Sequence, residues 1–130
     1  MAGATIHLSA NKQYDLHKIH EKIHRMDRAE QISKSVQEIN GVTVWVLAYE
    51  RYYFRVGGYA SVTVVLTEHD QTQTACIVAS GGGQGIINHS WGANRNFAKD
   101  CVEVLRSCGF DVVESDLDTR GKGFSERFLK

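Results

Sequence analysis

Two apolar alternating segments joined by Gly57-Gly58 constrain this chain more than any other feature. Residues 42–56 and 59–68 alternate between apolar and polar positions, and a third such segment follows at residues 73–80. Two-residue hairpin turns need positive φ at their central residues, which glycine supplies without strain. The sequence therefore predicts an antiparallel sheet at the centre of the protein.

Further elements are predicted on both sides of this sheet. Apolar residues recur at helical spacing in two segments, and weaker alternation marks short strands. We expect a strand at 5–9, a helix at 12–28, a strand at 31–39 that turns through Asn40-Gly41, a helix at 91–108 and a short strand at 110–113. The predicted fold is α+β, an antiparallel sheet of about four to six strands with two helices packed on one face.

Polar residues at the helix ends indicate where each helix begins and stops. Ser9 or Asn11 is expected to cap the first helix, and Asn88 or Ser90 the second. Gly109 suits the position after the second helix, where a left-handed residue commonly ends a helix.

Length and composition limit the class of protein. A chain of 130 residues fits one domain, which we place at residues 1–117. A polar, basic tail follows at 118–130, and Phe124 and Phe128 could anchor it to a neighbouring surface. The formal net charge is zero, which argues against nucleic acid as a partner. Three cysteines without metal-type spacing, no secretory leader and no membrane-length apolar run predict a cytoplasmic protein.

The predicted register puts an arginine on the apolar side of the sheet. If Gly57-Gly58 is the turn, Arg51 lies opposite Val64 and between Tyr49 and Tyr53, on the face that meets the helices. A buried guanidinium is costly unless it is paired or binds an anion. One interpretation is an arginine that stacks on a tyrosine and reaches water. The other is a site for a small anion, assisted by the two tyrosine hydroxyls.

A glycine-rich loop follows the third central strand. Its successive backbone N–H groups could converge on a phosphate or carboxylate, with donors added by the flanking side chains. The loop comprises Ser80, Gly81, Gly82, Gly83 and Gln84. It matches neither of the two common nucleotide-binding glycine patterns, so a crossover connection is the simpler interpretation.

Three histidines lie on one flank of the first predicted helix. His17, His20 and His24 fall at i, i+3 and i+7, and a pair at i, i+4 can share a zinc or nickel ion. A third ligand is not obvious, so a solvated or half-buried flank is the competing interpretation. We expect no resident cofactor.

The order of several short motifs resembles a known protein family. Tyr49-Glu50-Arg51-Tyr52, then Gly57-Gly58, then the glycine loop before Trp91-Gly92 look like a family of small bacterial proteins of unknown function. The resemblance spans about residues 42–109. It implies a soluble, bacterial, single-domain α+β protein, and it transfers no catalytic residue.

Three functional hypotheses follow from these residues. The favoured hypothesis is a non-enzymatic binding or interaction protein that holds a small anionic ligand near Arg51 and the glycine loop. It would dimerise through the other sheet face, where Tyr52, Phe54, Tyr59 and Val65 are apolar. The alternative is an enzyme acting on a phosphorylated or carboxylated molecule with Glu50 as acid or base, or a histidine-based metal-binding protein.

Overall fold

The computed structural model describes residues 3–12, 14–53, 58–81 and 87–115. Strands and helices follow each other in the order β1 (Gly3–Asn11), α1 (Leu16–His24), β2 (Glu30–Ile39), β3 (Val42–Tyr53), β4 (Gly58–His69), β5 (Thr72–Gly81), α2 (Ile87–Ser107) and β6 (Asp111–Ser115). The tail at 118–130, with Phe124 and Phe128, lies outside the described residues.

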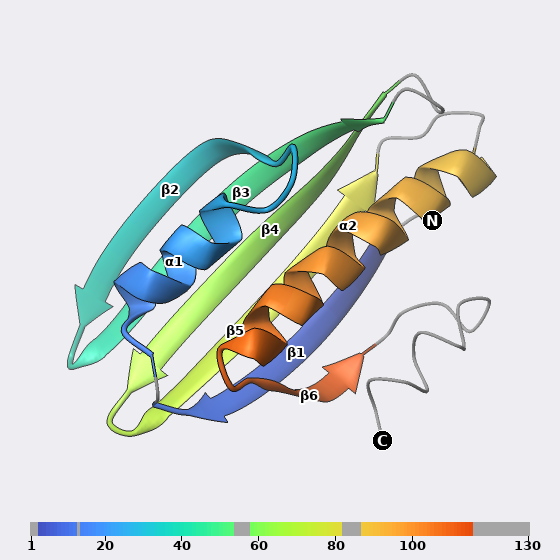
Figure 1. The fold of residues 1–130 in the computed structure, drawn as a ribbon. Helices are drawn as coiled ribbons and strands as arrows, with labels where there is room; N and C mark the ends of the chain where they lie inside the picture. Colours follow the sequence, from blue (N-terminus) through green and yellow to red (C-terminus); the bar gives the residue numbers. More distant parts are fainter. Residues whose placement is uncertain (1–2, 13, 54–57, 82–86, 116–130) are drawn as a thin grey trace.

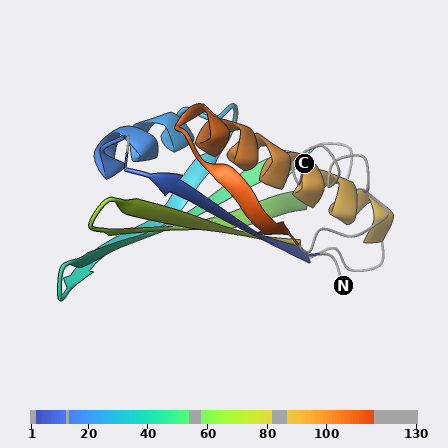
Figure 2. The same cartoon turned by 90° about the horizontal axis from the view of Figure 1, so that it is seen from below.

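The strands form one antiparallel sheet in the order β2-β3-β4-β5-β1-β6. Both helices lie on the same side of this sheet, which curves beneath them (Figures 1 and 2). The predicted α+β fold is confirmed, including the strand over residues 31–39. The chain returns to the sheet edge after α2, where β6 pairs with β1.

The core lies between the helices and the helix-facing side of the sheet. Alternate residues of the central strands are buried there, including Leu47, Val64 and Ile77, and α1 and α2 contribute Ile19, Ile23, Phe97 and Leu105. This two-layer arrangement leaves the other sheet face without a covering element among the described residues (Figure 2).

The register between β3 and β4 differs from the prediction. Tyr53 pairs with Gly58, and Arg51 lies opposite Ala60, not Val64. The connection is therefore longer than the two-residue Gly57-Gly58 turn, and residues 54–57 lie outside the described part. Because the shift is an even number of residues, every side chain keeps its predicted face.

The first helix is shorter than predicted, because β1 continues to Asn11. Ser9 and Asn11 pair with β5, so neither can cap a helix. The N-cap is Asp15, whose carboxylate accepts a hydrogen bond from the His17 backbone N–H at 3.1 Å. The helix ends at His24, and Arg28 has a φ of 59°, which excludes the predicted helical end there.

The second helix begins earlier than predicted but ends as expected. Its first residue is Ile87, so Asn88 and Ser90 lie inside the helix and are not caps. At the other end Gly109 has a φ of 93°, its N–H bonds the Arg106 carbonyl at 3.0 Å, and the Phe110 N–H bonds the Leu105 carbonyl at 3.1 Å. This hydrogen-bond pair is a Schellman motif, and it confirms Gly109 as the residue that ends the helix.

Neither helix, over the residues described, is both long enough and apolar enough to cross a membrane.

Candidate functional site

Arg51 is buried beneath the second helix and forms an ion pair there. Its residue is only 5% exposed, although it carries a charge. Its Nη1 atom donates to Oδ2 of Asp100 on α2 at 2.7 Å, and its guanidinium carbon lies 4.4 Å from the centre of the Phe97 ring. The ion pair and the aromatic ring together offset the cost of removing this cation from water.

The positions of these residues follow from two strands and one helix. The β3–β4 register sets Arg51 opposite Ala60, whose small side chain leaves room for a long one beside it. On α2, Phe97 and Asp100 are three residues apart and therefore neighbours on the helix surface. The helix thus presents a ring and a carboxylate to one guanidinium. The two charges differ in their surroundings, because the Asp100 side chain is 44% exposed.

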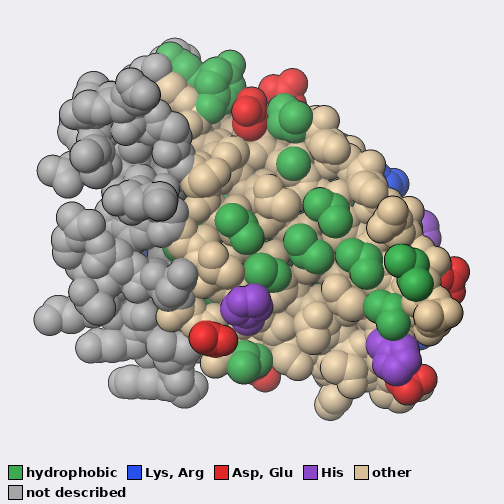
Figure 3. Space-filling view, turned by 180° about the vertical axis from the view of Figure 1, so that it is seen from behind, with side chains coloured by type: hydrophobic (Ala, Val, Ile, Leu, Met, Phe, Trp, Pro, Cys, Tyr) green, Lys and Arg blue, Asp and Glu red, His purple; other side chains and the backbone are tan. Residues whose placement is uncertain are grey.

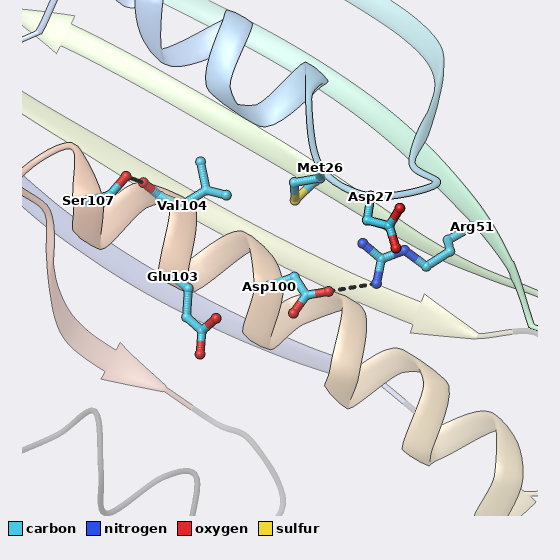
Figure 4. A pocket seen from close by; sticks show the side chains of 7 residues that line it. All are labelled: Met26, Asp27, Arg51, Asp100, Glu103, Val104 and Ser107. Carbon is cyan, nitrogen blue, oxygen red and sulfur yellow. Dashed lines mark hydrogen bonds and ion pairs between the residues drawn. The ribbon is translucent and has the colours of Figure 1, made fainter.

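A pocket of about 450 Å³ opens beside this ion pair, between the segment after α1 and the side of α2. In Figure 4 the side chains of Arg51 and Asp27 project toward each other, and Asp100 reaches Arg51 from α2. The lining residues are Met26, Asp27, Arg51, Asp100, Glu103, Val104 and Ser107. Three carboxylates against one guanidinium make the lining acidic overall, while Met26 and Val104 supply an apolar part.

Tyr49 lies on the same face as Arg51, but its hydroxyl is committed elsewhere. The residue is fully buried, and its hydroxyl donates to Oε1 of Gln31 at 3.1 Å. The same oxygen accepts from Nε2 of His20, at 2.8 Å, in the tautomer that carries the proton there. Burial raises the pKa of Tyr49 to about 12, with a smaller contribution from Cys101. This tyrosine therefore stays a neutral donor that connects β3 to β2.

Two of the three predicted metal ligands, His17 and His20, lie beside Trp45, and the ring of the third, His24, lies near those of His20 and Tyr49. The ring centres of His17 and His20 are 4.9 and 5.4 Å from that of the buried Trp45, and those of His20 and His24 are 5.8 Å apart. Within the described ranges no group of three or more His, Cys, Asp or Glu side chains is arranged to hold a metal ion. Metal binding by the histidines stays a prediction.

The structure describes two residues of the predicted glycine-loop site, Ser80 and Gly81. Gly81 ends β5 and shares a cross-strand row with Ala60 and Arg51, about 10 Å from the arginine across two strand spacings. Ser80 points to the other sheet face, where its hydroxyl is 3.0 Å from that of Ser61. The Tyr53 side chain and Gly82, Gly83 and Gln84 lie outside what the structure describes.

The sheet face away from the helices carries exposed apolar side chains, as Figure 3 shows. Val46, Tyr52, Tyr59 and Val78 are exposed on it, and the Tyr52 and Tyr59 rings meet edge to face with centres 5.1 Å apart. Phe54 lies outside the described residues. A homodimer through this face stays a prediction.

Glu50 also belongs to the face away from the helices, on the opposite side of the sheet from Arg51. Its cross-strand neighbours are Glu30 and Ser61. The two residues that an enzyme would have used together are therefore kept apart by the strand itself, since successive side chains of a strand alternate in direction.

Sequence patterns missed the partners that make the pocket. Asp100 falls on the polar flank of α2, where a carboxylate is ordinarily solvated, and Asp27 lies in a polar segment after α1. Gln31 stands in a strand that is otherwise exposed. An available signal was the buried arginine itself, which requires an acidic partner on whichever helix covers it.

A protein-family model matches most of this chain. No curated protein matches the sequence. The family model described as a family of unknown function (DUF6054) matches residues 1–109, which include the sheet from β1 to β5, both helices and all lining residues of the pocket. The chain therefore belongs to the family of unknown function DUF6054.

Proposed function

We propose that this protein is a non-enzymatic binding protein whose ligand occupies the pocket beside Arg51. The observation that carries the proposal is the unequal burial of the ion pair: the guanidinium is almost completely enclosed, whereas its partner carboxylate is partly in water. Asp100 can rotate toward solvent at low cost, and a carboxylate or phosphate of a ligand can take its place on Arg51. The arginine remains paired in both states.

The acidic lining narrows the chemical class of the ligand. A purely anionic molecule on Arg51 would approach the carboxylates of Asp27, Glu103 and the displaced Asp100. Repulsion between these like charges opposes binding, whereas a positive group on the same molecule would be attracted to the carboxylates. We therefore expect a small zwitterion: its anionic group on Arg51, its ammonium among the carboxylates, and its short carbon chain against Met26 and Val104.

The test compares a zwitterion with its two halves. The probe 4-aminobutyrate carries a carboxylate and an ammonium, butyrate carries only the first, and butylammonium only the second. Two-dimensional ¹H–¹⁵N NMR of the full chain, including the Arg51 Nε–H, is recorded during each titration. We expect shifts at Arg51, Asp100 and Asp27 with 4-aminobutyrate, and weaker ones with either half. Phosphoethanolamine against inorganic phosphate repeats the comparison for a phosphate group.

Substitutions then assign the two ends of the ligand. Arg51→Met should abolish the shifts caused by 4-aminobutyrate. Glu103→Gln should weaken the binding of 4-aminobutyrate and strengthen the binding of butyrate. Glu114→Gln, on a strand that does not line the pocket, is the matched control and should change the binding of neither probe. Equal shifts for butyrate and 4-aminobutyrate would remove the zwitterion assignment. The absence of any shift at pocket residues with all five probes would overturn the proposal.

A further inference from the structure

β2 forms one edge of the sheet and offers its outer side to a partner. Among the described residues it is paired with β3 on one side and with no strand on the other, and every side chain from Ile32 to Ile39 is exposed. An edge strand presents unpaired backbone donors and acceptors that can add a further strand. The opposite edge strand, β6, has five residues in the part of the chain that the structure describes and is bulged against β1, and both features discourage strand addition.

The hairpin that joins β2 to β3 determines which backbone groups of β2 point outward. Asn40 and Gly41 have φ values of 52° and 81°, as in a two-residue type I′ turn. Ile39 and Val42 pair directly around this turn, and the pair that closes a two-residue loop is hydrogen-bonded. Hydrogen-bonded pairs alternate along the ladder. The backbone groups of residues 34, 36 and 38 therefore point away from β3.

We propose that β2 pairs with β2 of a second copy of this chain, antiparallel and about a two-fold axis at Val36. In this register Val36 faces the partner's Val36, and Lys34 faces the partner's Glu38 on both sides of the axis. All of these positions have outward backbone groups, so the hydrogen-bonding pattern and the side-chain pattern agree. The interface would join two six-stranded sheets into one.

Charge selects this register over its neighbours. A shift of the axis to residue 34 sets Lys34 against the partner's Lys34, and a shift to residue 38 sets Glu38 against the partner's Glu38. Like charges directly opposite each other on a sheet are destabilising. An axis at residue 35 or 37 leaves each charge opposite an uncharged or apolar side chain. Only the axis at Val36 gives two opposite-charge pairs.

The surroundings of Val36 favour the same arrangement. Its side chain is 47% exposed and lies on the helix-facing side, directly opposite the buried Trp45 of β3. The Lys34 ammonium lies 5.0 Å from the centre of the Trp45 ring. α1 is set back from this edge over β2 and β3 (Figure 1), so it leaves the strand accessible. Pairing would bury the Val36 side chains of both copies, between the Trp45 side chain of one copy and that of the other.

Charge reversal provides a test that a general loss of stability cannot imitate. Sedimentation velocity and native mass spectrometry of the full chain should show a concentration-dependent dimer. K34E and E38K each create two like-charge pairs in the proposed register, so each alone should raise the dimer dissociation constant about tenfold or more. In an equimolar mixture of the two variants, every pair across the axis is again opposite in charge. The mixture should form heterodimers, and the double variant K34E/E38K should form homodimers.

Circular dichroism of each variant verifies that the fold is intact. Tyr59→Ser, on the sheet face away from the helices, is the control and should leave the dimer unchanged. The proposal is overturned if the wild-type chain is a monomer at all concentrations tested. It is equally overturned if the single variants dimerise as the wild type does, if the mixture stays monomeric, or if Tyr59→Ser alone removes the dimer.

Discussion

The Arg51 guanidinium and the Asp100 carboxylate lie 49 positions apart in the sequence and meet at 2.7 Å over the Phe97 ring. The arginine comes from the last part of β3, next to the edge strand, and the aspartate comes from the helix that covers it. One charge is enclosed and the other reaches water. This asymmetry has consequences for stability as well as for ligand binding.

Removal of the exposed partner should cost more than removal of the buried one. Asp100→Asn removes the carboxylate that is hydrogen-bonded to an enclosed guanidinium, and we expect a loss of about 2 kcal/mol in the free energy of unfolding. Arg51→Met keeps an unbranched chain over Phe97 and leaves a carboxylate that water can solvate, so the loss should be below about 1 kcal/mol. Urea unfolding measures both. A larger loss for Arg51→Met would contradict this account, and the double variant should be no less stable than Arg51→Met.

Gln31 should contribute more to stability than its place in an exposed strand implies. Gln31→Leu leaves the buried Tyr49 hydroxyl without its acceptor, at an expected cost of about 1–3 kcal/mol. Tyr49→Phe removes the donor as well, so Gln31→Leu/Tyr49→Phe should be less destabilised than the sum of the two single variants. Thermal unfolding of the four proteins gives the coupling. Additive effects would mean that the hydrogen bond contributes nothing.

Alkaline pH should destabilise the fold through Cys101. Burial raises the pKa of this thiol from 9.0 to about 12, although the Arg51 charge opposes the shift. The unfolded chain releases the thiol proton first, so the free energy of unfolding should be level below pH 9 and fall as the pH rises toward 12.

The matched variant for this prediction is Cys101→Ala. Without the Cys101 thiol the decline should be shallower. The remaining decline comes from Cys108, whose pKa burial raises above 9.0, and from Tyr49, whose pKa burial raises from 10.0 to about 12. Urea unfolding between pH 8 and 11 compares the two slopes, which do not depend on the packing lost at the substituted side chain. Identical slopes would show that Cys101 does not cause the decline.

The end of α2 depends on a glycine in the left-handed region. Gly109→Ala places a Cβ atom at a φ of 93°, and we expect a loss of about 1–2 kcal/mol. Gly109→Asn should lose less, because asparagine tolerates positive φ better than alanine does. Chemical unfolding of the two variants orders them. Equal stability of Gly109→Ala and the wild type would contradict the expected strain.

The sequence predicted those features that depend on residues close to one another in the chain. Alternation in the central strands, helical spacing of Phe97, Cys101 and Leu105, and Gly109 at a helix end all correspond to features of the structure. The faces of β3 and β4 were also correct, although the register was wrong by four residues. A period of two survives any even shift, whereas the length of a connection is not fixed by the glycines within it.

Helix starts were predicted poorly for a related reason. Ser9 and Asn11 are suitable caps by residue type, but β5 offers backbone partners to β1 as far as Asn11. Pairing with a strand some sixty positions away therefore decided whether those residues were strand or cap. Propensity gives way when a long-range ladder satisfies the same backbone groups.

The sequence by itself determined the fold class and the face of each central strand, including the apolar face on which Arg51 lies, because these depend on periodicities within single elements. Only the tertiary structure decided what meets that arginine. Asp100 and Asp27 look solvated in the sequence, and they line its pocket because α2 and the segment after α1 pack on the same side of the sheet. The charge of a site depends on side chains brought together from elements distant in the sequence, and local sequence patterns do not show which of these side chains will meet.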